Sequence, residues 1–159
     1  KTLNFPQDAP NTSKSKWRVM QVEYTVVTTK EVAYEYADDL QTIPTPVRVP
    51  RGWSIGDDLK KQGIKVDDGA SGDEKNFIKL LRMGKGSVVA LPQVAELYSG
   101  KKEFAGKLHA SKQPIKSKSY YLPFSKNSKV SKTDQQRIWD QIATVRDDAA
   151  FIEQASAKY

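Results

Sequence analysis

The chain has 159 residues, of which 38% are hydrophobic, so it can bury a core of ordinary size in one domain or one lobe. Its 26 Lys and Arg exceed its 19 Asp and Glu, and the net charge of +7 favours acidic partners or anionic surfaces. The sequence contains no cysteine, which excludes disulfides, thiolate zinc sites and cysteine nucleophiles, and we expect no redox chemistry.

Neither a membrane-spanning segment nor a secretion signal is evident. No apolar run approaches the roughly 20 residues that a helix needs to cross a bilayer. The chain also lacks an initiator Met and the apolar core of a signal peptide, as a mature or trimmed chain would.

The N-terminal part of the chain has the composition of extended structure. Residues 1–16, rich in Pro, Asn, Ser and Thr, predict a loop or an extended N-terminal arm. The stretch "WRVMQVEYTVVTT" over residues 17–29 predicts a long strand because it is rich in Val, Thr and Tyr with partial alternation. Residues 30–46 predict a hairpin or two extended arms around a turn at Asp38 and Asp39.

From residue 47 onward, short apolar runs alternate with helical patterns. The predicted strands are 47–49, 64–66, 87–91 and 119–125. Three predicted helices follow the candidate capping residues Ser54, Ser71 and Thr133, and a fourth starts at Pro92. The terminal helix is long, and its apolar residues recur on one face, at Ile138, Ile142, Val145, Ala149 and Ile152.

This alternation predicts an α/β fold with a largely parallel sheet flanked by helices. We expect a single α/β domain over residues 17–159, preceded by the arm over residues 1–16. In such sheets, ligands gather at the carboxyl ends of the strands. The turn "PRGWS" follows the predicted strand 47–49 and starts a helix, so it lies at such an end.

The turn "PRGWS" is therefore a candidate binding site. Gly52 allows a close backbone approach, Trp53 offers a flat apolar wall, and Arg51 adds a fixed positive charge. Unpaired N–H groups at the start of the helix capped by Ser54 favour an anion or a carbonyl oxygen. The structural alternative is that Ser54 only caps the helix and Trp53 packs under a loop. Glycine-rich nucleotide-binding motifs are absent, so a phosphate cofactor is not expected.

Catalytic signatures are also absent. The single histidine, His109, lies in a connector rich in Lys and Ser and is interpreted as a surface residue. No zinc-protease, serine-hydrolase or Ser-x-x-Lys motif occurs, and the paired aspartates fall mainly at turns and helix starts. We expect a protein that is not an enzyme and has no metal site and no cofactor.

The order of local motifs resembles the second lobe of the bacterial extracellular solute-binding proteins of family 3, which have the type 2 periplasmic-binding-protein fold. The resemblance covers residues 18–159 and rests on "VRVPRGWSIGDDLKKQGIKVDDGASGDEKNFIKLLRMGKGSVVALPQVAELYSG", "YYLPFSKNS" and the amphipathic terminal helix. It implies a two-lobed, non-enzymatic binder that closes on a small polar or anionic solute. The hinge would correspond to the strands near residues 20–28 and 119–126.

The resemblance also implies site residues. The second-lobe site would use Gly52, Trp53 and Ser54, with Arg51 at its rim. Arg18 lies where the family often has an arginine that holds a ligand carboxylate, and a solvated strand residue is the alternative. Tyr121 belongs to a strand with alternating aromatic residues, where it lines the cleft or packs in the core.

The implied partners are a small-molecule solute and a membrane transporter or receptor, in the periplasm or the extracellular space. Nucleic acid is not an expected partner, because the lysines of residues 101–132 are scattered and accompanied by few arginines. If the chain is a complete one-lobed relative, we expect a homo-oligomer.

Two departures from the family bear on these expectations. The family motif "GR.DAVV.D" appears here as "GKGSVVALP", so its aspartates are absent and a standard α-amino acid is not the expected ligand. Almost the whole first lobe, which would precede Arg18, is missing from the chain. The alternative function is a basic interaction module that binds an anionic polymer, a membrane surface or a protein partner, with an affinity that falls steeply as salt is added.

Overall fold

The computed structural model describes residues 2–9 and 15–157, and the chain divides into two compact units. Unit 1 consists of Lys1–Val22 and Ser117–Tyr159, and unit 2 consists of Glu23–Lys116. The chain passes between the units within the strand β2 (Met20–Thr29) and again at the start of β7 (Lys116–Tyr120). Each unit has its own set of elements.

Unit 2 is built on a mixed sheet with the strand order β4-β3-β5-β2-β6, and β7 pairs with β2. β3 (Val47–Arg48) runs parallel to β4 (Val66–Asp67) and to β5 (Ser87–Ala90). β2 runs antiparallel to β5 and to β6 (Leu108–Ala110). Because of these directions, the middle of β2 lies beside the carboxyl end of β5, where Thr25 pairs with Ala90.

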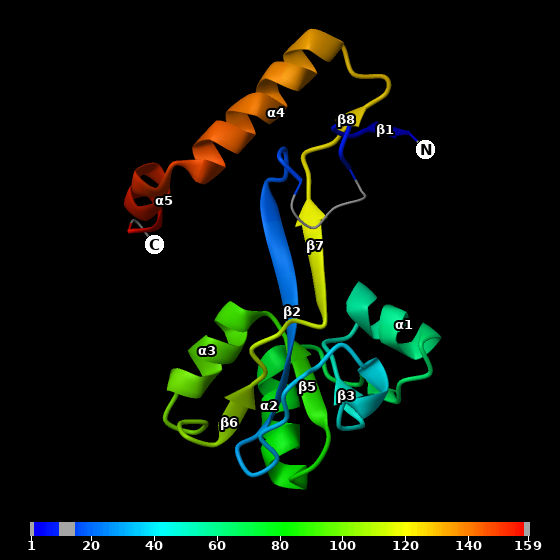
Figure 1. The fold of residues 1–159 in the computed structure, drawn as a ribbon, viewed down its shortest axis with the longest axis vertical. Coiled ribbons are helices and arrows are strands. Elements are labelled where there is room, and N and C mark those ends of the chain that lie inside the picture. Colours follow the sequence, from blue (N-terminus) through cyan, green and yellow to red (C-terminus); the bar gives the residue numbers. More distant parts are fainter. Residues whose placement is uncertain (1, 10–14, 158–159) are drawn as a thin grey trace. The chain divides into compact units, whose positions relative to one another are not determined.

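Each of the three parallel strands is followed by a helix (Figure 1). These helices are α1 (Ser54–Lys61) after β3, α2 (Asp73–Met83) after β4 and α3 (Pro92–Gly100) after β5. This alternation confirms the predicted α/β fold, with parallel strands flanked by helices. Between β2 and β3 the chain forms a short 3-10 helix, Leu40–Thr42, and residues 30–46 contain no strand. Of the two predicted alternatives, a hairpin or two extended arms, the hairpin is therefore wrong.

Both faces of the sheet in unit 2 are covered. Val27 and Val88 are paired in register and pack in one buried cluster with Phe77 and Leu80 of α2. Arg48 is the register partner of Val88, and side chains alternate along a strand, so the next residue, Val49, faces the other side of the sheet. There α1 approaches closely, because a Cβ at Gly56 would lie 2.9 Å from Val49 Cγ2.

In the part that the structure describes, unit 1 contains two short strands and two helices of its own, together with most of β7 and the first residues of β2. β1 (Leu3–Asn4) pairs antiparallel with β8 (Phe124–Ser125), and α4 (Lys132–Asp147) is followed by α5 (Ala149–Ser156). Trp139 of α4 is buried and packs edge to face on Phe124, with 5.5 Å between ring centroids.

The segment that precedes β2 is tied to α4. The indole Nε1–H of Trp17 donates to Asp140 Oδ1 at 2.7 Å. Arg146 Nη1 donates to the backbone oxygens of Lys16 at 2.8 Å and Arg18 at 2.7 Å. These bonds to side chains of α4 fix residues 16–18 within unit 1.

Several predicted boundaries differ from the structure at capping residues. α2 starts after Gly72 instead of after the predicted capping residue Ser71. α4 starts after Ser131 instead of after Thr133, and the Oγ of Ser131 accepts the N–H of Asp134. The single terminal helix that we predicted is interrupted at Asp148, whose carboxylate accepts the N–H of Phe151 and caps α5. The predicted strand 119–125 is likewise interrupted, between β7 and β8.

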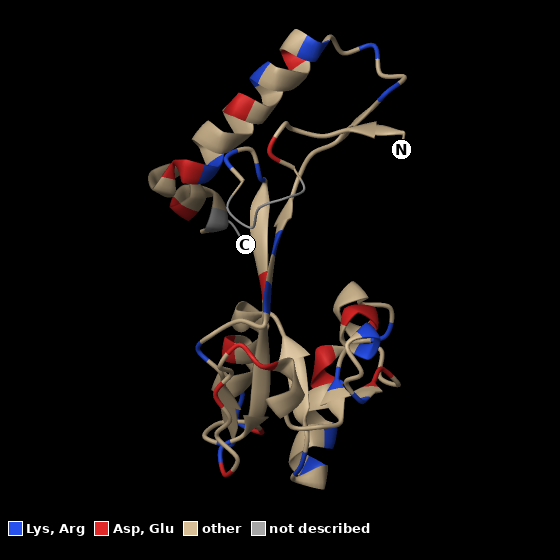
Figure 2. Ribbon diagram, turned by 45° about the vertical axis from the view of Figure 1, so that its right-hand side comes forward, with Lys and Arg blue, Asp and Glu red and all other residues tan. Residues whose placement is uncertain are grey.

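Charged residues are spread over both units, and Figure 2 shows basic and acidic residues alternating along α4. In the part of the chain that the structure describes, no helix combines the length and the apolar character needed to span a membrane.

Candidate functional site

The turn between β3 and α1 lies at the carboxyl edge of the parallel strands in unit 2. Four of the predicted site residues, Arg51 to Ser54, follow one another in this turn, so a single loop brings them together. Arg51, Gly52 and Ser54 are exposed, and Trp53 is half-buried. Gly52 has φ +83°, a left-handed conformation that favours glycine.

Trp53 is held from one side by a buried aromatic residue of β2. Its ring lies edge to face with Tyr24 at 6.1 Å between centroids, and Tyr24 is only 5% exposed. The backbone N–H of Trp53 donates to the oxygen of Pro50 at 3.2 Å, which closes the turn. The turn and the tyrosine together fix the indole at the edge of the sheet, with part of its surface open to solvent.

The prediction that Ser54 caps α1 is wrong. Trp53 occupies the capping position, with extended backbone angles of φ −76° and ψ 130°, and Ser54 is the first helical residue. An indole cannot accept the N–H bonds that a serine or aspartate accepts at this position, and the Trp53 side chain makes no capping hydrogen bond. The capping position of α1 therefore provides no side-chain oxygen, and Asp57 is the acidic residue in the first turn of the helix.

The guanidinium of Arg51 is fixed beside the turn by the loop that follows β4. Its Nη2 donates to the oxygen of Gly69 at 2.8 Å, and its backbone N–H donates to the oxygen of Ala70 at 2.8 Å. Asp68 of the same loop accepts from Lys60 Nζ at 2.6 Å. Lys60 lowers the pKa of Asp68, and Arg51 adds a smaller effect in the same direction.

Beneath this edge, an ionic cluster joins β3, β4 and α2. Arg48 is 3% exposed, donates from Nη1 to the oxygen of Lys85, and lies 3.9 Å from Asp67 Oδ2 through Nε. Lys79 of α2 reaches the same carboxylate at 3.2 Å. Burial raises the pKa of Asp67, but the N–H of Gly69 and the Lys79 ammonium outweigh it, so the pKa lies below its ordinary value. The cluster supports the loop that holds Arg51.

The sequence interpretation missed both this cluster and a nearby pocket that polar and charged side chains line in part. Arg48 interrupts an otherwise apolar strand, and that interruption was the available signal for the cluster. The pocket, of about 260 Å³, lies where β2 enters unit 2 and α3 begins, and its lining includes Glu23, Thr25, Pro92 and Glu96. These residues come from separate segments of the chain, so no local sequence motif predicts the pocket.

The remaining predicted site residues, Arg18 and Tyr121, belong to unit 1. Arg18 is half-buried and donates from Nη1 to the oxygen of Ser15 at 2.7 Å. Tyr121 is half-buried and packs edge to face on Phe5, with 6.3 Å between centroids. Their membership of one site with Arg51 to Ser54 stays a prediction.

Within the described residues, no group of three or more His, Cys, Asp or Glu side chains is placed to hold a metal ion. His109 lies on β6, and its Nε2 is 2.9 Å from Glu35 Oε1 at the surface. The backbone N–H of Lys112 is the main cause that lowers the pKa of Glu35, with a smaller contribution from His109.

No protein-family model and no curated protein matches the sequence, but solved structures do. The GluR0 ligand-binding core from Nostoc punctiforme, in complex with (L)-glutamate, is similar with TM-score 0.62 and 16% identity, over 99% of this chain and 65% of that one. AbpA from Streptococcus pneumoniae, an amino acid ABC transporter substrate-binding protein bound to L-arginine, gives TM-score 0.60 and 11% identity over 96% and 59%. Holo ArgBP from T. maritima gives TM-score 0.55 and 15% identity over 99% and 63%.

The chain has the type 2 periplasmic-binding-protein fold. This result confirms the fold that the sequence resemblance implied. The chain spans between 59% and 65% of the lengths of these three structures, so more than a third of each type 2 fold has no counterpart in residues 1–159.

Proposed function

We propose that this chain is a non-enzymatic, solute-binding protein whose unit 2 takes a small polar or anionic solute at the turn between β3 and α1. The observation that carries the proposal is the placement of Trp53: an indole fixed by Tyr24, partly open, at the carboxyl edge of the parallel strands. Ligands of α/β folds collect at this edge. The similar solved structures are ligand-binding cores and substrate-binding proteins, which supports a binding role.

The turn provides complementary groups for an anion attached to an apolar or ring-shaped body. The start of α1, whose capping position provides no side-chain oxygen, and the fixed guanidinium of Arg51 suit a carboxylate or a similar anion. The indole of Trp53 suits the apolar body. Leu91 and Pro92 follow β5 where the family motif has a carboxylate, so that carboxylate is absent and a standard α-amino acid is not the proposed ligand. Glu23 and Glu96 line the neighbouring pocket but are not part of that motif.

The proposed role is to deliver the solute to a membrane transporter or to report it to a receptor, in the periplasm or outside the cell. Two of the similar proteins are, by their descriptions, substrate-binding proteins of amino acid ABC transporters. Transport and sensing both begin with solute binding, so a binding experiment tests the step that the two roles share.

Thermal-shift and calorimetric screening tests the proposal with the 159-residue chain and with the longest polypeptide that its reading frame encodes. The panel contains aliphatic and aromatic carboxylates, sugar acids, neutral sugars and amino acids. A true ligand raises the melting temperature progressively, because binding to the folded state adds about 2.7 kcal/mol of stability at a hundredfold excess over Kd. If no compound stabilises either polypeptide, the binding function is contradicted.

A further inference from the structure

The loop that holds the guanidinium of Arg51 also carries two carboxylates. Asp67 is the last residue of β4, and Asp68 directly precedes Gly69, whose oxygen accepts from Arg51 Nη2 at 2.8 Å. Guanidinium and carboxylate groups form strong, charge-assisted pairs, and a guanidinium in such a pair attracts an external anion less. The Arg51 site can therefore favour an anion only if other groups hold these two carboxylates.

Lysines of the two neighbouring helices hold both carboxylates. Asp67 lies 3.2 Å from the Nζ of Lys79, which is on α2. Lys60, on α1, donates from Nζ to Asp68 Oδ2 at 2.6 Å. In the part of the chain that the structure describes, the ion pairs of these carboxylates do not include Arg51. The guanidinium is thus not neutralised by the acids of its own loop.

Asp68 is the less firmly held of the two aspartates. Asp67 is reached by a second cation, because Arg48 Nε lies 3.9 Å from the same oxygen that Lys79 contacts. Asp68 has Lys60 as its ion-pair partner, and the side chains of that pair are 43% and 44% exposed. Loss of Lys60 would therefore release Asp68, whereas loss of Lys79 would leave Arg48 beside Asp67.

Arg51 is close enough to act on the Asp68 carboxylate. The hydrogen bond from Lys60 is the main cause that lowers the pKa of Asp68, and the positive charge of Arg51 lowers it further. The residue next to Asp68, Gly69, is the one to which Arg51 donates. A carboxylate that has one lysine partner, and a guanidinium within electrostatic range, has a second partner available once the lysine is removed.

We propose that Lys60 is a specificity-determining residue of the Arg51 site, because it holds the Asp68 carboxylate and so keeps the guanidinium of Arg51 available to an anion. Without Lys60, Asp68 pairs with Arg51, and an external anion has to displace it. This inference rests on the proposed function, in which Arg51 receives the anionic group of a solute. It adds that a lysine on α1 sets how strongly that group is bound.

The first test needs no solute. Carbon-detected NMR titration gives the Asp68 pKa in the parent, in Lys60→Met and in the double variant Lys60→Met/Arg51→Met. We expect a pKa below the ordinary value of about 3.9 in the parent and in Lys60→Met, where Arg51 takes over as the partner, and the ordinary value only in the double variant. If Lys60→Met alone brings the Asp68 pKa to its ordinary value, the carboxylate does not pair with Arg51 and the proposal is wrong.

The second test measures binding by calorimetry with benzoate, an aromatic carboxylate, and benzamide, its neutral analogue. Lys60→Met should weaken benzoate binding about two- to fivefold, the size of an exposed ion pair, and leave benzamide binding unchanged. Asp68→Asn should strengthen benzoate binding more in the Lys60→Met background than in the parent, because only there does Asp68 compete for Arg51. An equal effect of Asp68→Asn in both backgrounds would mean that the charges act independently, which would overturn the proposal.

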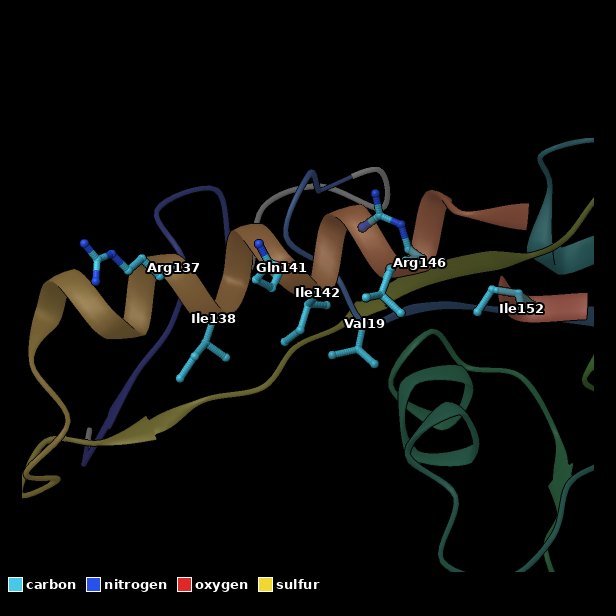
Figure 3. Close-up of a pocket in the computed structure, with 8 residues that line it drawn as sticks. Val19, Arg137, Ile138, Gln141, Ile142, Arg146 and Ile152 are labelled. Carbon is cyan, nitrogen blue, oxygen red and sulfur yellow. The ribbon is translucent and has the colours of Figure 1, made fainter. Parts of the chain in front are cut away.

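Arg137→Met is the matched control for the loss of a surface ion pair. Arg137 Nη1 lies 3.6 Å from Asp134 Oδ1 on α4, beside the apolar groove of unit 1 that Figure 3 shows. The variant removes one positive charge from an exposed pair, as Lys60→Met does, and should change neither the Asp68 pKa nor the benzoate affinity. Equal weakening by both variants would identify an effect of net charge and contradict the role of Lys60. If neither benzoate nor any compound of the screen binds the parent, the proposed function fails, and the Asp68 titration still decides whether Lys60 keeps this carboxylate from Arg51.

Discussion

Tyr24 and Trp53 meet edge to face, with 6.1 Å between ring centroids and 65° between the ring planes. Tyr24 is buried in β2 and gives the indole a fixed support, whereas Trp53 is only half-buried. A ring that is held on one side and open on the other can receive a ligand with little loss of side-chain entropy. The same contact also makes Trp53 part of the fold, so its two contributions have to be separated.

The Trp53→Ala variant separates the contribution of Trp53 to folding from its contribution to solute binding. Loss of the edge contact destabilises unit 2 by about 0.5–1.5 kcal/mol beyond the buried area, and loss of the stacking wall weakens solute binding by about 1–3 kcal/mol. Calorimetric titration with a solute found by the screen gives the second quantity, and urea unfolding gives the first. Trp53→Phe keeps a ring and is expected to lose less of both. If the alanine variant unfolds far more readily but binds normally per folded molecule, Trp53 is only a packing residue.

Gly86→Ala is expected to destabilise the strands that position the turn. Gly86 has φ +81°, and a Cβ there would lie 2.5 Å from the oxygen of Pro46 and 2.9 Å from Arg48 Nη1. Gly63 is the matched control, because it has φ +77° and open space around it. Both variants lose about 1–2 kcal/mol from the left-handed backbone, and Gly86→Ala loses about 1–3 kcal/mol more from overpacking. Equal losses in urea unfolding would show that the close approach of β3 and β5 is not rigid.

The α/β fold of unit 2 was predictable because its pattern is local. Each signal can be recognised within a short stretch of sequence: the short apolar strands, the helical periodicity, and Gly84, which ends α2 in a left-handed conformation. β6 was missed because its sequence, Leu108 to Ala110, has no strand pattern of its own and is held as a strand by pairing with β2.

The candidate site was predictable only in part, because only its local part can be recognised in the sequence. Arg51 to Ser54 are neighbours in sequence, so the turn could be recognised, although Trp53 and not Ser54 occupies the capping position. The support of Trp53 by Tyr24, and of Arg51 by Gly69, joins segments that are distant in sequence, and no periodicity encodes such contacts. Arg18 and Tyr121 stay predictions, since they lie in the other unit.

The stability of unit 1 is expected to depend on pH through Asp140. The indole N–H of Trp17, 2.7 Å from its carboxylate, is the main cause that lowers the pKa of Asp140, with help from Gln136 and Lys16. A carboxyl group whose pKa is lowered on folding stabilises the folded state above its unfolded pKa of about 3.9. That stability is lost as pH falls through the lower, folded pKa.

Trp17→Phe removes the indole donor, so the pKa of Asp140 is expected to rise toward its ordinary value in a carbon-detected NMR titration. The variant should melt at a lower temperature than the parent at neutral pH, and the difference should shrink in strongly acidic solution. Asp140→Asn is the control, because it keeps an acceptor oxygen but cannot titrate in this range. An Asp140 pKa that is the same in the parent and in Trp17→Phe would contradict the assigned cause.

Arg51 is expected to distinguish anionic from neutral solutes. Its Nη2 is used by the oxygen of Gly69, but a guanidinium has five N–H donors, so others are available to a ligand in the exposed turn. A charge-assisted hydrogen bond contributes about 1.5–3 kcal/mol, so Arg51→Met should weaken the binding of an anionic solute roughly 10- to 150-fold. Arg51→Lys keeps the charge without the planar fork, and its affinity for the anionic solute should fall between those of the parent and Arg51→Met.

Arg82→Met, on the exposed end of α2, changes the net charge equally and should leave binding unchanged. Calorimetric titration with one anionic and one neutral solute from the screen decides between the two roles of Arg51. An equal loss for both solutes would mean that Arg51 acts by holding the loop at Gly69, and not by contacting the anion.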